Sequence, residues 1–235
     1  MTGPADLPAR AAYDRWSRTY RVTGRNALAD AAERAVMAVL PAPSGMDLLD
    51  VGCGDGRWMA ILRRRGAARV FGVDLSRGML DAARRQAPHA PVAAADMRRL
   101  PFAPATFDGA LHALALGHVR ELGAAMAAVA CVLRPGGWLV LADVHPTAAA
   151  RGWRRTFRDA DGASRAVRWY PHPLATVVGA CLAAGLQVER VSECAVDPRA
   201  LPSGAPAEAS GGPAAYALRA RRLGSAARRR AGAVC

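Results

Sequence analysis

Residues 46–56, MDLLDVGCGDG, decide the fold of this 235-residue chain. The run from Met46 to Val51 is apolar except for its acids, and it predicts a buried parallel strand. Glycines follow at Gly52, Gly54 and Gly56, and the next residues, RWMAILRRR, have the composition of a helix. Open α/β sheets bind nucleotide-like ligands at such a strand–turn–helix junction, because a glycine lets the ligand approach the backbone closely.

The spacing of the glycines narrows the class of ligand. A dinucleotide fold requires G-x-G-x-x-G, whose third glycine would fall at position 57, and this chain has Arg57 there. NAD and FAD are therefore disfavoured. The chain contains no lysine, which excludes a standard phosphate-binding P-loop.

Further strands are predicted in order along the chain. RVFGVDLS (69–76) contains Asp74 at its end, and PVAAADM (91–97) contains Asp96. FDGALHALALGHV (107–119) holds a fourth strand, and LRPGGWLVLADVHP (133–146) holds a helix stop at residues 135–137 and then a fifth strand. An acid at the position of Asp74 can accept hydrogen bonds from both hydroxyls of a ribose.

This ordered set resembles the class I S-adenosylmethionine-dependent methyltransferases, which include enzymes of ubiquinone, menaquinone and biotin biosynthesis. The resemblance runs from Tyr13 to Arg222. It implies an α/β, doubly wound, seven-stranded and mostly parallel sheet of the Rossmann-like methyltransferase type. LQVERVSE (186–193) and AAYALRARR (214–222) would be its sixth and seventh strands, the last one antiparallel.

The resemblance implies S-adenosyl-L-methionine as cofactor. Asp74 is expected to bind the ribose hydroxyls, Asp96 the adenine amino group, and Asp50 the methionine end. The glycine turn would lie along the amino-acid and ribose parts, and the region from His112 to Leu114 would offer a backbone carbonyl. The expected cofactor residues are Asp50, Gly52, Cys53, Gly54, Asp74, Leu75, Asp96, Met97 and His112.

An N-terminal cap is predicted over residues 1–40. Tyr13, Trp16 and Tyr20 are spaced to share one face of a helix, which alone indicates a helix packed on the core. The resemblance implies more, since the family's N-terminal segment covers the cofactor and lines the substrate site. A second helix is expected from Asn26, as N-cap, to residue 40.

A lid is predicted over residues 147–172, because Asp161-Gly162 is typical of a hairpin turn between two short strands. It would bring Trp153, Trp169 and His172 near the acceptor, beside Tyr13 and Trp16 of the cap. The methyltransferase domain is expected to span residues 41–222. The basic tail, residues 223–235, is expected to be disordered.

Methyl transfer needs an aligned acceptor, and it needs a base only if the acceptor starts protonated. The candidate catalytic residues are His145, His118, Tyr13 and Tyr20. His145 follows the fifth strand, where an imidazole could accept a proton at neutral pH. The alternative is that this histidine stabilises the turn at Pro146. For His118 a structural role is favoured over a catalytic one, because a histidine is common in the corresponding loop of the family.

Composition and charge limit which other classes of protein this chain can belong to. The formal net charge is +13, and all 32 basic residues are arginines. Their scatter along the sequence favours a solvated basic surface and GC-rich codon usage over a nucleic-acid site. The stretch HALALGHV lacks the [DNS]-P-P-[YFW] motif of base-modifying amino-methyltransferases. No metal cluster, signal peptide or membrane span is expected, and five cysteines without C-x-x-C indicate a reduced, cytoplasmic protein.

The sequence therefore predicts S-adenosylmethionine-dependent methyl transfer to oxygen, nitrogen or carbon of a small organic acceptor, in specialised metabolism, by a monomer or homodimer. Two alternatives remain open. One is an RNA or protein methyltransferase that uses the arginine-rich surface. The other is a protein of this fold that catalyses a different reaction, such as a cyclisation, or only binds the cofactor.

Overall fold

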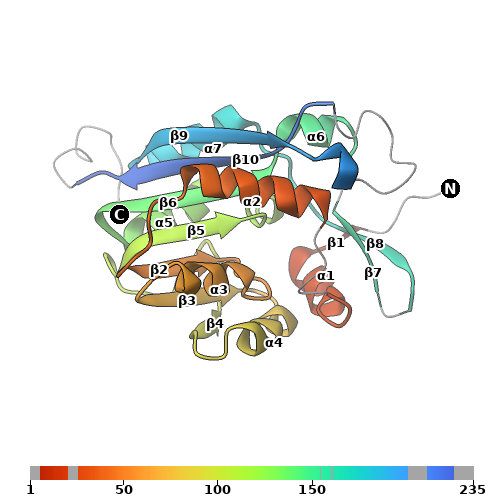
Figure 1. Ribbon diagram of the computed structural model, residues 1–235, viewed down its shortest axis with the longest axis horizontal. Coiled ribbons are helices and arrows are strands. Elements are labelled where there is room, and N and C mark those ends of the chain that lie inside the picture. Colours follow the sequence, from red (N-terminus) through yellow and green to blue (C-terminus); the bar gives the residue numbers. More distant parts are fainter. Residues whose placement is uncertain (1–5, 21–25, 154, 160, 201–210, 225–235) are drawn as a thin grey trace.

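A seven-stranded sheet forms the centre of the computed structural model, which describes residues 6–20, 26–153, 155–159, 161–200 and 211–224 (Figure 1). In spatial order its strands are β4 (Val92–Ala94), β3 (Arg69–Asp74), β2 (Asp47–Val51), β5 (Phe107–Ala113), β6 (Leu133–Val144), β10 (Pro213–Arg222) and β9 (Leu186–Ala195). All neighbours pair in parallel except β10, which is antiparallel to both β6 and β9. The predicted doubly wound sheet, with an antiparallel last strand, is confirmed.

Helices cover both faces of this sheet. The α-helices of the described residues are α1 (Ala9–Trp16), α2 (Ala27–Val39), α3 (Arg57–Arg64), α4 (Arg77–Gln86), α5 (Leu122–Val132), α6 (Pro146–Ala150) and α7 (Leu174–Ala183), and of these α1 packs on α4 and the lid instead of on the sheet. On β2, Leu48 packs in the apolar cluster under α2, α3 and α4, whereas Leu49 packs in the cluster under α5 and α7. A strand buried on both faces needs apolar residues at successive positions, which explains the apolar run from Met46 to Val51.

Local signals in the sequence set the helix ends. The Asn26 side chain accepts a hydrogen bond from the Ala29 N–H at 2.8 Å, and that of Ser76 accepts one from Met79 at 3.2 Å. Gly66 and Gly185 follow α3 and α7 with φ of +94° and +74°, the left-handed conformation that ends many helices. The cap at Asn26 is at the predicted position.

Two elements differ from the prediction. The expected helix stop at residues 135–137 is wrong, because α5 ends at Val132 and Leu133 already pairs with Phe107 as the first residue of β6. Gly136, with φ of +78°, instead lies within an irregular start of that strand. The short helix α6 directly after β6 was not predicted.

The lid contains the predicted hairpin. Strands β7 (Thr156–Arg158) and β8 (Ser164–Val167) are antiparallel, and Gly162 takes φ of +75° in the turn between them. A two-residue strand that the sequence did not reveal, β1 (Asp6–Leu7), pairs in parallel with β8. Figure 1 shows this second sheet and α1 together at one end of the main sheet.

The two helices of the cap have different surroundings. Helix α1 packs on the lid, where Trp16 stacks on Phe157 with ring centroids 5.0 Å apart. Helix α2 packs on the main sheet, with Ala31 against Ala214 and Ala215 of β10. Helix α1 also ends at Trp16, earlier than predicted.

The domain limits at residues 40 and 222 stay predictions, and most of the tail, residues 225–235, lies outside the described residues.

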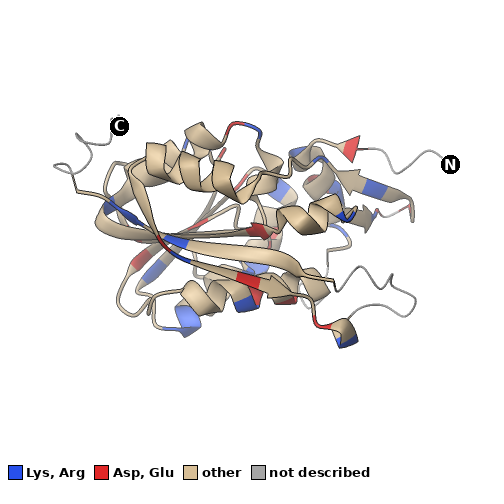
Figure 2. Cartoon of the chain, turned by 90° about the horizontal axis from the view of Figure 1, so that it is seen from above, with Lys and Arg blue, Asp and Glu red and all other residues tan. Residues whose placement is uncertain are grey.

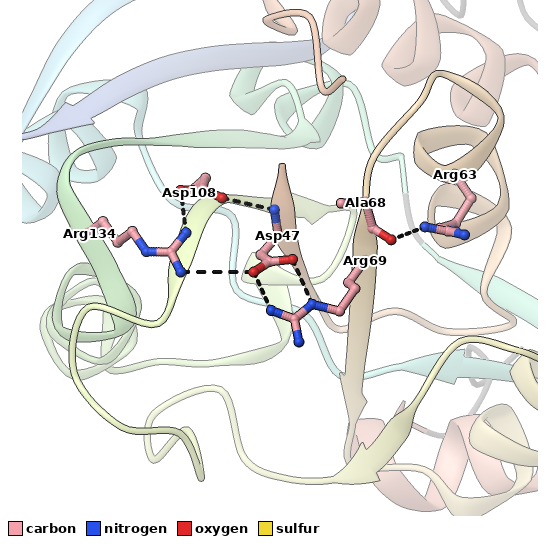
Figure 3. Close-up of polar contacts among 6 residues, drawn as sticks. All are labelled: Asp47, Arg63, Ala68, Arg69, Asp108 and Arg134. Carbon is pink, nitrogen blue, oxygen red and sulfur yellow. Dashed lines mark hydrogen bonds and ion pairs between the residues drawn. The ribbon is translucent and has the colours of Figure 1, made fainter. Parts of the chain in front are cut away.

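Ion pairs join the amino ends of the central strands (Figure 3). The Asp47 carboxylate binds the Arg69 guanidinium through Nε at 2.7 Å, and it lies 3.8 Å from Arg134. Asp108 accepts a hydrogen bond from the Asp47 N–H at 2.9 Å and pairs with Arg134. This network holds β2, β3, β5 and β6 together at the edge opposite the glycine turn.

Basic residues are spread over helices, strands and loops (Figure 2). Many of them are paired with acids. The pairs are Arg57–Glu33, Arg69–Asp47, Arg84–Asp81, Arg98–Asp96, Arg98–Glu121, Arg134–Asp108, Arg165–Asp159, Arg219–Glu189 and Arg221–Glu189. Arg10–Asp14 and Arg134–Asp47 are further pairs, at 3.9 and 3.8 Å. The scatter differs from a basic patch or stripe gathered on one face, which is typical of a nucleic-acid site. Within the described ranges, no helix combines the length and the apolarity needed to cross a membrane.

Candidate active site

A cavity of about 350 Å³ lies at the carboxyl ends of β2, β3 and β5. The glycine turn forms its floor, and the aromatic residues of α1 face it from the cap. This is the end of an open parallel sheet at which ligands bind. The volume falls within the range of sites for small molecules and cofactors.

Glycine is required at two positions of the turn. Gly52 and Gly54 have φ of +72° and +54°, and a Cβ on Gly52 would lie 2.6 Å from Cβ of Ala115. Between them Cys53 is buried, and burial raises the pKa of its thiol well above the ordinary value. A thiol that stays protonated is a poor nucleophile. Cys53 therefore fits the turn as a small residue, while its backbone can face a ligand.

Asp74 fixes the turn relative to α4. One carboxylate oxygen accepts the Gly54 N–H and the other accepts the Ser76 N–H, both at 2.9 Å. The side chain also lines the cavity. The spare lone pairs of its carboxylate oxygens are therefore available to hydroxyl donors at the position where a ribose is expected.

Buried acids below the turn suit a cationic ligand. Burial, followed by the nearby charges of Asp74 and Asp55, raises the pKa of Asp50 to about 8. One oxygen of Asp50 and one of Asp55 are buried without a hydrogen-bond partner. A buried carboxylate oxygen without a hydrogen-bond partner destabilises the folded protein unless a ligand supplies a donor. The ammonium and sulfonium of S-adenosylmethionine carry the matching charge, so the residues present fit this cofactor; Asp55 lines the cavity and Asp50 does not.

The expected adenine side is partly as predicted. Leu75 and Met97 line the cavity. Asp96 does not line it, because its carboxylate turns to the Arg98 side chain, with Nη2 at 2.6 Å and Nε at 3.0 Å. That ion pair lowers the pKa of Asp96. Ala95 and Met97 line the cavity beside this ion pair, and the contact of Asp96 with an adenine amino group stays a prediction from the sequence.

His112 is a core residue. Its side chain is fully buried, with Nε2 3.2 Å from the Met97 sulfur, and desolvation lowers its pKa to about 4. The residues after it, Ala113 and Leu114, line the cavity. The prediction of a backbone contribution from this strand end is consistent with that placement, whereas the His112 imidazole itself does not reach the site.

Tyr13 and His118 form a hydrogen-bonded pair in the cavity wall. The Tyr13 hydroxyl lies 3.0 Å from Nε2 of His118, and Nδ1 lies 3.2 Å from the carbonyl oxygen of Arg168. A carbonyl only accepts, so Nδ1 carries the proton and Nε2 accepts from the tyrosine. Burial, helped by the charge of Arg155, lowers the His118 pKa to about 4. Burial also raises the Tyr13 pKa, so both groups are neutral at pH 7.

The other aromatic residues of the cap join this pair. Trp16 stacks on Tyr13 with ring centroids 5.6 Å apart, and Tyr20 meets Trp16 edge-on at 5.1 Å. Both line the cavity, and burial raises the pKa of the Tyr20 phenol. Tyr13, Trp16 and Tyr20 therefore all line the cofactor cavity, although Tyr20 lies beyond the end of α1 and not on a shared helix face as predicted.

His145 is not where the base prediction requires it. It is the N-cap of α6, and its Nδ1 accepts from the Thr147 N–H at 3.1 Å. Its Nε2 lies 2.8 Å from the Glu193 carboxylate. The residue does not line the cavity. The expectation that His145 points to the acceptor is therefore wrong, because both ring nitrogens are used in holding α6 to β9.

The lid tryptophans line a smaller adjoining cavity. Trp153 and Trp169 enclose it together with Leu28 and Asp143, and it shares Leu114, His118 and Arg155 with the main cavity. His172 is absent from both linings and its Nε2 lies 2.8 Å from the Val119 carbonyl oxygen. Two of the three lid residues predicted to contact the acceptor therefore line a cavity, and their contact with the acceptor stays a prediction, whereas the His172 ring binds the loop at Val119.

Arg155 is the residue that sequence reasoning missed. It lines both cavities and stacks over Tyr13 and Trp16, with its guanidinium carbon 5.8 and 5.6 Å from the ring centroids. In the sequence it stands in the run RRTFR, one arginine among 32. Only its place directly before the first strand of the hairpin could have distinguished it.

Comparisons with known proteins agree with this geometry. Residues 49–141 match the family described as a methyltransferase domain. A malonyl-[acyl-carrier protein] O-methyltransferase of Pectobacterium atrosepticum is 31% identical over 167 residues, 70% of this chain and 60% of that protein. An O-methyltransferase of Penicillium expansum is 35% identical over 56% of this chain and 51% of its own length. The matches thus span between half and two thirds of these curated relatives.

A solved structure extends the likeness over the fold. An S-adenosylmethionine-dependent methyltransferase from Mesorhizobium loti superposes with a TM-score of 0.67 and 28% identity, covering 83% of this chain and all of that one. Recognition of the chain as a class I S-adenosylmethionine-dependent methyltransferase is thereby confirmed, as is S-adenosyl-L-methionine as the cofactor of that class.

Proposed function

We propose that this protein transfers the methyl group of S-adenosylmethionine to an oxygen atom of a small organic acceptor. The observation that carries the proposal is the Tyr13–His118 pair, which lies in the same cavity as the glycine turn. The O-methyltransferases among the relatives support oxygen as the receiving atom. The cavity is enclosed by single side chains of the cap and lid, which favours a small acceptor over RNA or protein.

The cofactor supplies an activated methyl group on its sulfonium. The chain then has to align the acceptor, exclude water and receive a proton. We assign the first two tasks to Trp16, Trp153 and Trp169. For the third, Tyr13 Oη accepts the acceptor's hydroxyl proton while its own proton passes to Nε2 of His118. The Arg168 carbonyl holds His118 in the tautomer that this transfer needs.

The proposed role of Tyr20 is secondary. It lines the same cavity but has no hydrogen bond to a histidine among the described residues, so we assign it to shaping the wall. Specialised metabolism is the proposed setting, because the lid's sequence is idiosyncratic. The protein is proposed to act as a monomer or homodimer in the cytoplasm without nucleic acid.

The test is methyl transfer from labelled S-adenosylmethionine to a panel of phenols, enols, carboxylic acids and amines, followed as formation of S-adenosylhomocysteine and methylated product. For a hydroxyl acceptor, Tyr13→Phe and His118→Gln should each lower the rate roughly 10²–10⁴-fold. Tyr170→Phe is the matched control, because Tyr170 lines neither cavity. Product formation without S-adenosylhomocysteine, or transfer only to nitrogen or carbon, would overturn the proposal.

A further inference from the structure

Arg155 carries a positive charge into the interior without a carboxylate partner among the described residues. Its Nε is buried and has no hydrogen-bond partner. The ring centroids of Tyr13 and Trp16 lie 5.8 and 5.6 Å from its guanidinium carbon, and the side chains of Tyr13 and Tyr20 hydrogen-bond to the guanidinium, so Nε is the donor left without a partner. A buried charged donor left unpaired is costly, and proteins retain one where a ligand completes it.

The backbone of the lid fixes this arginine in place. The Arg155 carbonyl accepts the Val167 N–H at 2.9 Å, which ties the residue to the hairpin. The side chain lines both the cofactor cavity and the smaller cavity between the lid tryptophans. It therefore lies at the junction through which an acceptor must reach the methyl group.

The nearest buried acid is already engaged. Asp143 lines the smaller cavity, and its two carboxylate oxygens accept the N–H groups of Gly117 and Val144, both at 2.7 Å. It is not within ion-pair distance of Arg155 in the described part of the chain. Asp143 therefore does not supply the missing partner of Arg155 Nε.

We infer that the methyl acceptor carries a carboxylate and that Arg155 is the specificity-determining residue that binds it. The inference rests on the proposed function, since it names the class of acceptor for the same site. The smaller cavity holds only about 20 Å³, close to the space of one water molecule, so the rest of the acceptor lies in the main cavity, where Trp16 and Leu114 offer apolar contacts. A guanidinium matches the two oxygens of a carboxylate, and a carboxamide of equal size lacks the charge.

The experiment compares acids with their own amides on protein saturated with S-adenosylhomocysteine. The probes are benzoate and benzamide, phenylacetate and phenylacetamide, and salicylate and salicylamide, titrated by ligand-observed NMR. At least one acid should bind about 10- to 100-fold more tightly than its amide. Arg155→Gln should abolish that preference and Arg155→Lys should keep part of it. Arg158→Gln, a change at an exposed lid arginine that lines neither cavity, should leave it unchanged.

Saturation with S-adenosylhomocysteine separates this inference from the proposed function. A protein that does not bind S-adenosylhomocysteine refutes the function itself. If it does bind, equal binding of acids and amides in the unmutated protein, or no binding of either, overturns the inference while the function stands. An acid preference that persists in Arg155→Gln overturns it as well. Each variant's affinity for S-adenosylhomocysteine reports whether it is folded.

Discussion

At the scale of single residues, burial decides which titratable groups can act. His118, His145 and His112 were equally visible in the sequence, yet one lines the cavity, one caps a helix and one lies in the core. Residue type and position at a strand end could not predict these different roles, because each role depends on the hydrogen-bond partners that the folded chain supplies. The same holds for Asp96, whose partner is the arginine two residues later.

The pH dependence of the rate should identify His118. It accepts a proton only when neutral, and its pKa is about 4. For a hydroxyl acceptor, kcat/KM should therefore stay level from pH 8 down to about 5 and fall only as the pH approaches 4, whereas an unperturbed histidine would give a fall near 6.5. A rate profile measured from pH 4 to 8 decides between them. A midpoint near 6.5 would assign the base to another group.

Cofactor binding should release a proton from Asp50. Burial and neighbouring acids raise its pKa to about 8, so it is mostly protonated at pH 7 in the free protein. A bound cation favours the charged form and lowers that pKa. Titration calorimetry with S-adenosylmethionine at pH 7 should give different enthalpies in phosphate and Tris, and Asp50→Asn should remove most of the difference. Equal enthalpies in both buffers for the unmutated protein would contradict this assignment.

His145→Ala should affect stability and leave chemistry intact. Loss of the N-cap and of the contact with Glu193 should lower the free energy of unfolding by about 1–2 kcal/mol. The single-turnover rate should stay within about threefold, since the residue does not line the cavity. Urea unfolding and rapid-quench kinetics measure the two effects, with Glu193→Gln as a milder companion. A stable variant that has lost most of its rate would restore His145 as a catalytic candidate.

At the scale of elements, the approach of α1 to α4 closes the cavity. The Ser76 hydroxyl donates to the Asp14 carboxylate at 2.7 Å. A Cβ on Gly78 would lie 2.2 Å from Oγ of Ser17 and 2.9 Å from its Cβ. The contact joins the cap to the helix that follows the ribose-binding strand, so the cap's position is coupled to the cofactor site.

Gly78→Ala should therefore loosen the cap. Alanine favours a helix over glycine by about 1 kcal/mol, so α4 itself gains stability, and any loss arises from displaced α1. We expect the melting temperature to hold or rise while affinity for S-adenosylmethionine falls. Gly123→Ala in α5 is the matched control, because nothing lies within 4 Å of its Cβ position. Unchanged affinity in Gly78→Ala would show that α1 does not contribute to cofactor binding.

At the scale of the whole molecule, repeated local signals made the sheet predictable. Apolar runs, strand-end acids, N-caps and post-helical glycines each fix a short stretch, and their order selects one topology. The acceptor side was less predictable, because it forms where the cap, the lid and the end of β5 meet. Arg155 is the example, since its significance lies in stacking on Tyr13 and Trp16 and not in its neighbours along the chain.

The central claim is that the cavity at the glycine turn binds S-adenosylmethionine through Asp74. The most direct test is calorimetric titration of S-adenosylhomocysteine into the unmutated protein, Asp74→Ala and Asp96→Ala. We predict one site per chain, an affinity loss of about 5- to 150-fold for Asp74→Ala, and near-native affinity for Asp96→Ala, which lies outside the cavity. Unchanged affinity in a folded Asp74→Ala, or a large loss in Asp96→Ala, would contradict the account.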